Sequence, residues 1–247
     1  MEIDKIDFET FSINPGGKES LVIIIEDKYF SSECRNVFRD YFKSASELNK
    51  NGISESESLS NFSNIHILNN FPLDGPGLMG FVDRLYEILR DQGLRFSYLT
   101  GIGLGSCVVQ QFAISHSRFA RRVALFDPVS RVGVRSFLGS AIDFLESKIP
   151  CGLPLRKGGS DFDSRSEIHR LHSPSLVCVS PEAGSYVVQE SNLLCERLPN
   201  VWRGSFSLTS LSDVSGVSNF FQTISSFLDV PAKAPQKNSF SRKQEIL

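Results

Sequence analysis

The sequence lacks the features that mark several specialised classes of protein. Its five cysteines never form a Cys-x-x-Cys pair, and their odd number does not fit a disulfide framework. The net charge of −2 offers no excess of positive charge for binding nucleic acid or an anionic membrane surface. We therefore expect a reduced protein that binds no nucleic acid.

Long apolar runs are missing as well. No stretch approaches the ~18 consecutive apolar residues that a membrane-spanning helix needs. The first ten residues, MEIDKIDFET, lack the charged-then-apolar layout of a signal peptide. We expect a soluble, cytoplasmic protein without a membrane span.

What is present is an alternation between strand and helix periods. The continuous apolar run LVIII at 21–25 indicates a strand buried on both faces of a sheet. The other predicted strands lie at 64–68, 96–100, 122–126, 175–179 and 202–208, with helical spacing around 37–42 and over 81–89, 104–113 and 217–228. Short strands alternating with helices predict an α/β fold with a mostly parallel central sheet and helices on both faces.

The two ends of the chain and one internal segment depart from this alternation. Residues 6–13 and the turn after them predict an antiparallel hairpin at one edge of the sheet. An insert at about 130–172 holds one amphipathic helix and then a loop rich in glycine, proline and serine. We predict a single domain over 1–230 and a disordered tail over 231–247.

Three alternating glycines, Gly101, Gly103 and Gly105, stand between the strand 96–100 and the next helix. In this setting the segments resemble the α/β-hydrolase fold family over roughly residues 6–229. The stretch NIHILNNFPLDGPG is similar to a family strand with its D-x-P-G-x-G loop, and FSYLTGIGLGSCVVQQF is similar to the nucleophile elbow with its helix. The insert stands where the family has its cap. The resemblance implies an α/β-hydrolase-like sheet with a small cap.

The same resemblance shows which catalytic groups of the family are absent from this sequence. The family elbow reads G-x-S-x-G, and here Gly103 stands at the serine position. All four histidines precede residue 173, so the loop 209–216, where the family has its base, holds none. Glu26 and Asp27 replace the H-G of the oxyanion loop, where negative charge would repel an oxyanion. Glu182, at the position of the family's acid, has no imidazole to orient.

These absences predict a non-catalytic protein that binds a protein partner or a small apolar ligand and uses no cofactor. We expect its site at the carboxyl ends of the strands, with room left by the missing side chain of Gly103. The predicted site residues are Asp27, Lys28, Gly103, Leu104, Asp127 and Glu182, with Phe137, Leu138 and Leu145 of the insert turned toward the opening. No residue is assigned a catalytic or metal-binding role.

Two alternatives remain open. The first is an active hydrolase of an ester or thioester with atypical residues, for which Ser106 and Cys107 are displaced nucleophile candidates. The second is a nucleotide-binding domain, because Gly101 and Gly103 begin a G-x-G-x-x-G pattern and Asp127 ends the next strand. That fingerprint normally opens its sheet, whereas this turn follows at least three strands.

Overall fold

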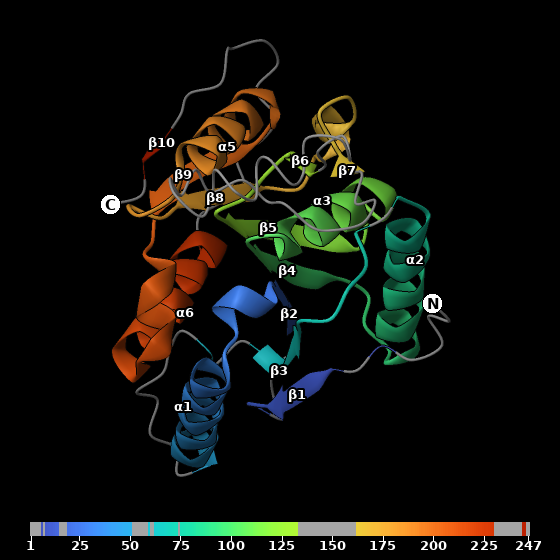
Figure 1. The fold of residues 1–247 in the computed structure, drawn as a ribbon. Coiled ribbons are helices and arrows are strands. Elements are labelled where there is room, and N and C mark those ends of the chain that lie inside the picture. Colours follow the sequence, from blue (N-terminus) through green and yellow to red (C-terminus); the bar gives the residue numbers. More distant parts are fainter. Residues whose placement is uncertain are drawn as a thin grey trace.

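The structure is a computed structural model that describes residues 6, 8–14, 19–50, 59, 62–73, 75–132, 162–229 and 244–245. Short strands alternate with helices along the chain (Figure 1). The strands are β1 (Glu9–Ser12), β2 (Glu19–Ile25), β3 (Phe62–Leu68), β4 (Ser97–Ile102), β5 (Ala120–Phe126), β6 (Arg131–Val132), β7 (Phe162–Asp163), β8 (Ser175–Val179), β9 (Val201–Ser205) and β10 (Gln244–Glu245). The α-helices are α1 (Ser32–Lys50), α2 (Gly75–Asp91), α3 (Gly105–Ser115), α5 (Ser185–Arg197) and α6 (Val214–Asp229), and the 3₁₀ turns are η1 (Asp27–Tyr29), η3 (Ile168–Arg170) and η4 (Leu208–Ser212).

Most strands form one sheet in the order β1-β3-β2-β4-β5-β8-β9-β10. Every neighbouring pair in it is parallel except β1 with β3. The predicted α/β class with a mostly parallel sheet is therefore confirmed. The short antiparallel pair of β6 and β7 lies within the predicted insert and pairs its start with Phe162 and Asp163. Of the predicted tail, only β10 is described, beside β9, so disorder of the remainder stays a prediction.

Strand β1 corrects the predicted hairpin. It pairs antiparallel with β3, Glu9 opposite Ile67, and not with the next strand in sequence. Strand β2 is buried on both faces and has β3 and β4 as parallel neighbours, so neither of its edges is open to β1. The side chains of β1 alternate between half-buried and exposed, which suits a strand at the edge of a sheet.

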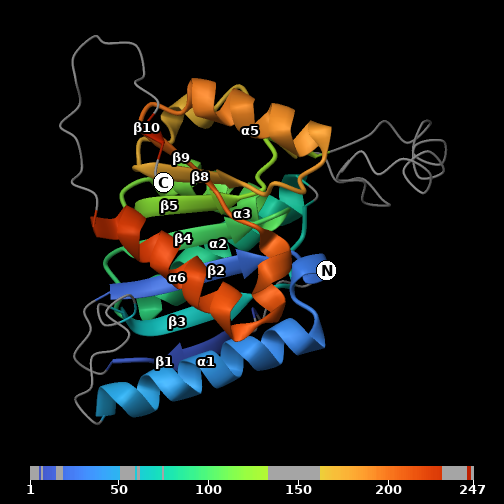
Figure 2. The same cartoon turned by 90° about the vertical axis from the view of Figure 1, so that its left-hand side faces the viewer.

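Helices cover both faces of the sheet. Along β2, Val22 and Ile24 pack into a core with residues of α2, α3 and α5, while Leu21, Ile23 and Ile25 pack against α1 and α6. Figures 1 and 2 show α1 and α6 on one side of the sheet and α2 and α3 on the other. All five of these β2 side chains are fully buried, which confirms the predicted central strand.

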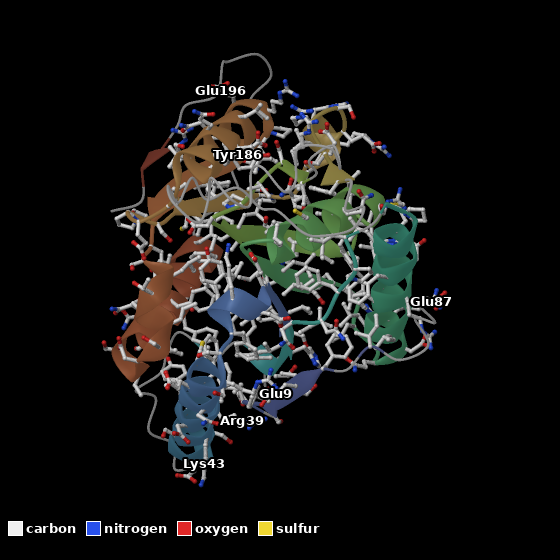
Figure 3. The ribbon with its side chains drawn as sticks, in the orientation of Figure 1. Glu9, Arg39, Lys43, Glu87, Tyr186 and Glu196 are labelled. Carbon is white, nitrogen blue, oxygen red and sulfur yellow. The ribbon has the colours of Figure 1, made fainter. Side chains whose placement is uncertain are left out.

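Aromatic side chains join the two helices on the first of these sides. Phe38 and Phe42 of α1 meet Phe221 of α6 with ring centroids 6.1 and 5.3 Å apart. Arg39 on the outer part of α1 forms an ion pair with Glu9 of β1 (Figure 3). Helix α1 is thereby attached both to the closing helix α6 and to the edge of the sheet.

The hydrogen-bond ladder continues one residue beyond the carboxyl ends of three neighbouring strands. The N–H of Glu26 donates to the carbonyl of Ile102 (3.1 Å), and that of Gly103 donates to Phe126 (2.9 Å). The N–H of Asp127 donates to the carbonyl of Cys178 at 2.9 Å. The first residues of three loops, Glu26, Gly103 and Asp127, are thus fixed along one edge of the sheet.

His66 of β3 is a buried titratable group far from that ladder in sequence. Only 3% of it is exposed, and its Nδ1 lies 3.0 Å from the hydroxyl of Thr10 in β1. Among the described residues its Nε2 has no hydrogen-bond partner. Burial lowers the pKa of His66 to about 4, so its ring is neutral in the folded protein near pH 7.

We expect His66→Gln to remove part of the acid sensitivity of folding. In the unfolded chain His66 takes up a proton below about pH 6.5, while the folded protein resists protonation down to about pH 4. Stability conferred by the neutral ring is therefore present above pH 6.5 and is lost as the pH falls toward 4, by roughly 2–4 kcal/mol. Urea unfolding at pH 7.5, 6, 5 and 4.5 measures this loss.

The exposed His169 provides the matched control. His169→Gln should keep the wild-type decline in unfolding free energy, while His66→Gln should flatten it. Parallel curves for all three proteins would show that His66 titrates normally.

Candidate active site

The glycine turn forms a tight link between β4 and α3. Gly103 lies in the left-handed region of backbone conformation, with φ of +58°, directly after the last strand residue, Ile102. The N–H of Ser106 donates to the carbonyl of Gly103, and that of Cys107 donates to Leu104, both at 3.0 Å. The chain therefore passes from strand to helix within two residues.

The flanking glycines allow close approach of the backbone. A Cβ on Gly101 would overlap the backbone of Ser106, and a Cβ on Gly105 would overlap the carbonyl of Ile24 in β2. Side chains at these positions would push α3 away from the sheet. Packing thus explains the outer two glycines, as expected from the sequence.

The space above the middle glycine, Gly103, is not empty as expected. A Cβ on Gly103 would overlap a carboxylate oxygen of Glu26 and the ring of Tyr29. The room that we expected above Gly103 is therefore filled by two side chains from the loop after β2. Sequence reasoning noted Glu26 only as an obstacle to an oxyanion and missed Tyr29.

Glu26 is held at this point by three contacts. Its Oε2 accepts a hydrogen bond from the N–H of Leu104 at 2.9 Å and lies 3.3 Å from the Nζ of Lys28. Its own N–H is bonded to the carbonyl of Ile102. Only 12% of its side chain is exposed. The carboxylate thus caps the start of α3, where unpaired N–H groups and the helix dipole favour negative charge.

The 3₁₀ turn η1 explains why Glu26 and Tyr29 meet the same glycine. The N–H of Tyr29 donates to the carbonyl of Glu26 at 2.9 Å, and residues three apart lie above one another in such a turn. Lys28 lies with its Nζ 4.7 Å from the centroid of the Tyr29 ring. Asp27 instead accepts a hydrogen bond from Asn69 after β3 (2.7 Å), on the other side of β2 from Gly103.

Asp127 follows β5 and is the second buried carboxyl group at this edge. It has a φ of +45° and is 4% exposed, and its Oδ1 accepts a hydrogen bond from the N–H of Ser180 at 2.6 Å. Burial raises the pKa of Asp127, although its hydrogen bonds with Ser180 act in the opposite direction. The charge of Glu182 raises that pKa further, and the charge of Lys28 lowers it.

Glu182 is exposed and is attached to the loop after β9. Its Oε1 accepts hydrogen bonds from the hydroxyls of Ser207 (2.5 Å) and Thr209 (3.1 Å). The bond from Ser207 is the main cause of a lowered pKa of the Glu182 carboxyl. Ser207 and Thr209 thus bind Glu182. They lie just before and at the start of the loop 209–216, where the resemblance implies a histidine.

The four histidines lie elsewhere. His116 follows the far end of α3 and stacks on Tyr86 at 4.1 Å, and His66 lies within β3. His169 and His172 precede Ser173, whose hydroxyl bonds the carbonyl of Ala120 at the opposite end of β5. No group of three metal-binding side chains occurs in the part of the chain that the structure describes.

The displaced nucleophile candidates are buried. Ser106 and Cys107 have no exposed surface, and the Cys107 sulfur lies against the carbonyl of Val129 at 3.9 Å. Burial raises the pKa of Cys107 far above the usual range of a thiol. Neither residue is placed to attack a substrate.

Buried polar side chains hold the base of the insert. Gln110 Nε2 donates to the carbonyl of Val129 (2.9 Å), and the Ser164 hydroxyl donates to Gln110 Oε1 (2.7 Å). Glu190 of α5 accepts hydrogen bonds from the N–H (3.1 Å) and the hydroxyl of Ser130. These bonds attach the insert to α3 and α5 at Ser130 and Ser164. The predicted cap residues Phe137, Leu138 and Leu145 lie outside the described residues.

Comparison with known proteins identifies the fold. No protein-family model matches the sequence, and no curated protein matches it. Among solved structures, the chain is similar to MGS-M2, an alpha/beta hydrolase enzyme from a Medee basin deep-sea metagenome library, with 14% identity and a TM-score of 0.61 over 94% of this chain and 97% of that one. It is similar to the enol-lactonase from Burkholderia xenovorans LB400 (13%, 0.58, over 90% and 96%) and to a thermophilic esterase from Thermogutta terrifontis (13%, 0.59, over 90% and 92%).

The protein has the α/β-hydrolase fold, as the resemblance implies. The comparison contradicts the expectation of a non-catalytic binding protein, because the similar structures are those of a hydrolase enzyme, a lactonase and an esterase. It favours the alternative of a hydrolase with atypical residues. No described helix is both long enough and apolar enough to span a membrane.

We expect Gly105→Ala to destabilise the elbow more than an alanine at an open glycine. The new Cβ would overlap the Ile24 carbonyl, so α3 must move from β2, at a cost of about 1–3 kcal/mol in unfolding free energy. Gly93→Ala is the control, because a Cβ there has no heavy atom within 4 Å and only its φ of +81° is unfavourable, costing about 1–2 kcal/mol.

Chemical denaturation of the two variants measures the difference, and resistance of α3 amides to hydrogen exchange locates it. If Gly105→Ala unfolds like Gly93→Ala and keeps its α3 protection, the contact with Ile24 does not constrain the elbow.

Proposed function

We propose that the protein hydrolyses a carboxylic ester, open or cyclic, or a thioester, with the Glu26 carboxylate acting on water in place of a serine nucleophile. The observation that carries this proposal is the overlap between the Glu26 carboxylate and the side-chain position of Gly103. The loop after β2 thus places a carboxylate oxygen where a side chain on residue 103 would stand. The likeness to an esterase and an enol-lactonase supports the choice of substrate class.

Glu26 acts as the general base. It accepts a proton from water, and the water oxygen attacks the carbonyl carbon of the substrate. The Nζ of Lys28 lies 3.3 Å from Oε2 and compensates the negative charge of the carboxylate. The pKa of Lys28 is itself raised, because its interactions with Glu26 and Tyr29 outweigh the lowering effect of burial, so the ammonium stays charged.

Asp127 acts as the general acid. Its raised pKa increases the fraction of the protonated carboxyl, which can donate to the departing oxygen or sulfur as the bond to the carbonyl carbon breaks. The proton received by Glu26 returns through solvent to the Asp127 carboxylate. The balance is one ester and one water converted to one acid and one alcohol, or to a thiol from a thioester.

Glu26→Gln tests the base. We expect the purified protein to hydrolyse p-nitrophenyl acetate, p-nitrophenyl butyrate or a short acyl thioester, and Glu26→Gln to lower kcat about 10²- to 10⁴-fold, because the amide cannot accept the proton. The glutamine oxygen can still accept the Leu104 N–H bond, so the fold should persist. Glu33→Gln, on the exposed start of α1, is the matched control and should keep the wild-type rate. Wild-type protein no faster than buffer on all three substrates, or a fully active Glu26→Gln variant, would refute the proposal.

Asp127→Asn tests the acid. In the wild-type protein kcat should decline as the pH rises through the raised pKa of Asp127, because the protonated donor is lost. Asparagine tolerates a positive φ and keeps an oxygen for the Ser180 N–H, but it cannot donate a titrating proton. The variant should have a lower kcat and no alkaline decline of this origin.

The control for this experiment is Asp83→Asn, a carboxylate 60% exposed beside His116. Its pH profile should coincide with that of the wild-type protein. An unchanged alkaline limb in Asp127→Asn would assign the donor to another group.

A further inference from the structure

The proposed reaction needs a donor for the carbonyl oxygen, which gains negative charge as water attacks. The N–H of Leu104, next to Gly103, already donates to Glu26 Oε2 at 2.9 Å. Lys28 lies 3.3 Å from the same carboxylate oxygen. A further polar hydrogen close to Gly103 would complete the site.

Tyr29 is the described side chain whose position fits this need. The ring atom nearest to a Cβ built on Gly103 is Cε2, which is bonded to the carbon that bears the hydroxyl. Tyr29 is half-buried. The 3₁₀ turn sets this ring above Glu26, so base and hydroxyl approach the elbow from the same loop.

We propose that the Tyr29 hydroxyl donates the hydrogen bond that stabilises the oxyanion of the tetrahedral intermediate. This inference rests on the hydrolytic function proposed above and adds to it a residue that touches the reacting oxygen. Tyr29 donates without transferring its proton, so the balance of the reaction is unchanged.

The electrostatic surroundings of Tyr29 suit a donor. Burial raises the pKa of Tyr29, the charge of Lys28 lowers it, and the charges of Asp127 and Glu26 raise it; a side-chain hydrogen bond with Lys28 also lowers it. The phenol therefore stays protonated through the neutral range, as hydrogen-bond donation requires.

Tyr29→Phe tests the assignment by turnover. Phenylalanine keeps the ring over Gly103 and removes only the hydroxyl, so kcat should fall about 10²- to 10³-fold, the usual effect of losing one oxyanion donor, with little change in KM. Tyr41→Phe is the matched control, because Tyr41 stacks on Phe221 at 5.5 Å in the α1–α6 layer. It should keep the wild-type kcat and KM.

A binding experiment tests the same hydroxyl without turnover. Monoethyl methylphosphonate imitates the shape and charge of the tetrahedral oxyanion and is not hydrolysed as an ester of a carboxylic acid. Calorimetric titration should give a Kd about tenfold weaker for Tyr29→Phe than for the wild-type protein and for Tyr41→Phe.

The two experiments separate failure of this inference from failure of the proposed function. Turnover that is lost in Glu26→Gln but kept in Tyr29→Phe overturns the assignment of Tyr29 and leaves the function standing. No wild-type turnover, together with phosphonate binding that depends on Tyr29, rejects the function and reduces Tyr29 to an anion-binding residue, which overturns its assignment as an oxyanion donor. Equal phosphonate affinity in Tyr29→Phe and wild type, or no binding to the wild type, overturns the assignment in either case.

Discussion

The hydrogen bond between the Leu104 N–H and the Glu26 carboxylate is the contact on which the arrangement of this edge depends. It joins the loop after β2 to the first turn of α3 across 78 positions of sequence. The bond can form only because Gly103 has no side chain, since a Cβ there would overlap the same carboxylate. The position of Glu26 therefore requires the glycine, and a serine at this elbow would displace Glu26 from the helix terminus.

This contact changes the interpretation of Glu26, which stands in the sequence where the family has its oxyanion loop. A carboxylate near an oxyanion site is unfavourable if it points at a developing negative charge. Held by an amide and an ammonium group, the Glu26 carboxylate instead has its charge compensated and one face turned toward the elbow. Asp127 differs from it in environment, because burial favours its protonated form. Two carboxyl groups in unlike surroundings are the usual basis for separate acid and base roles, which is how we assign them in the proposed reaction.

The sequence predicts the scaffold well because burial leaves clear patterns. The run LVIII, the elbow glycines and the apolar spacing of α6 all reflect packing between neighbouring elements, and the structure agrees with each. The partner of β1 is not predictable in this way, because strand pairing depends on which edges remain free after the parallel strands assemble.

The site was less predictable, because the resemblance directed attention to absent residues, above all to the serine replaced by Gly103. Tyr29 was missed because its role depends on the 3₁₀ turn that places it above Glu26, and neither aromatic content nor spacing indicates such a turn.

Gln110, Ser130, Ser164 and Glu190 form a polar junction that ties the insert to helices α3 and α5. Strands β6 and β7 place Val132 opposite Phe162. The hydrogen bonds of the junction join Val129, Ser130 and Ser164 to side chains of α3 and α5. Two polar side chains, Gln110 and Glu190, consequently anchor the chain on either side of β6 and β7 to the same layer of helices as the elbow.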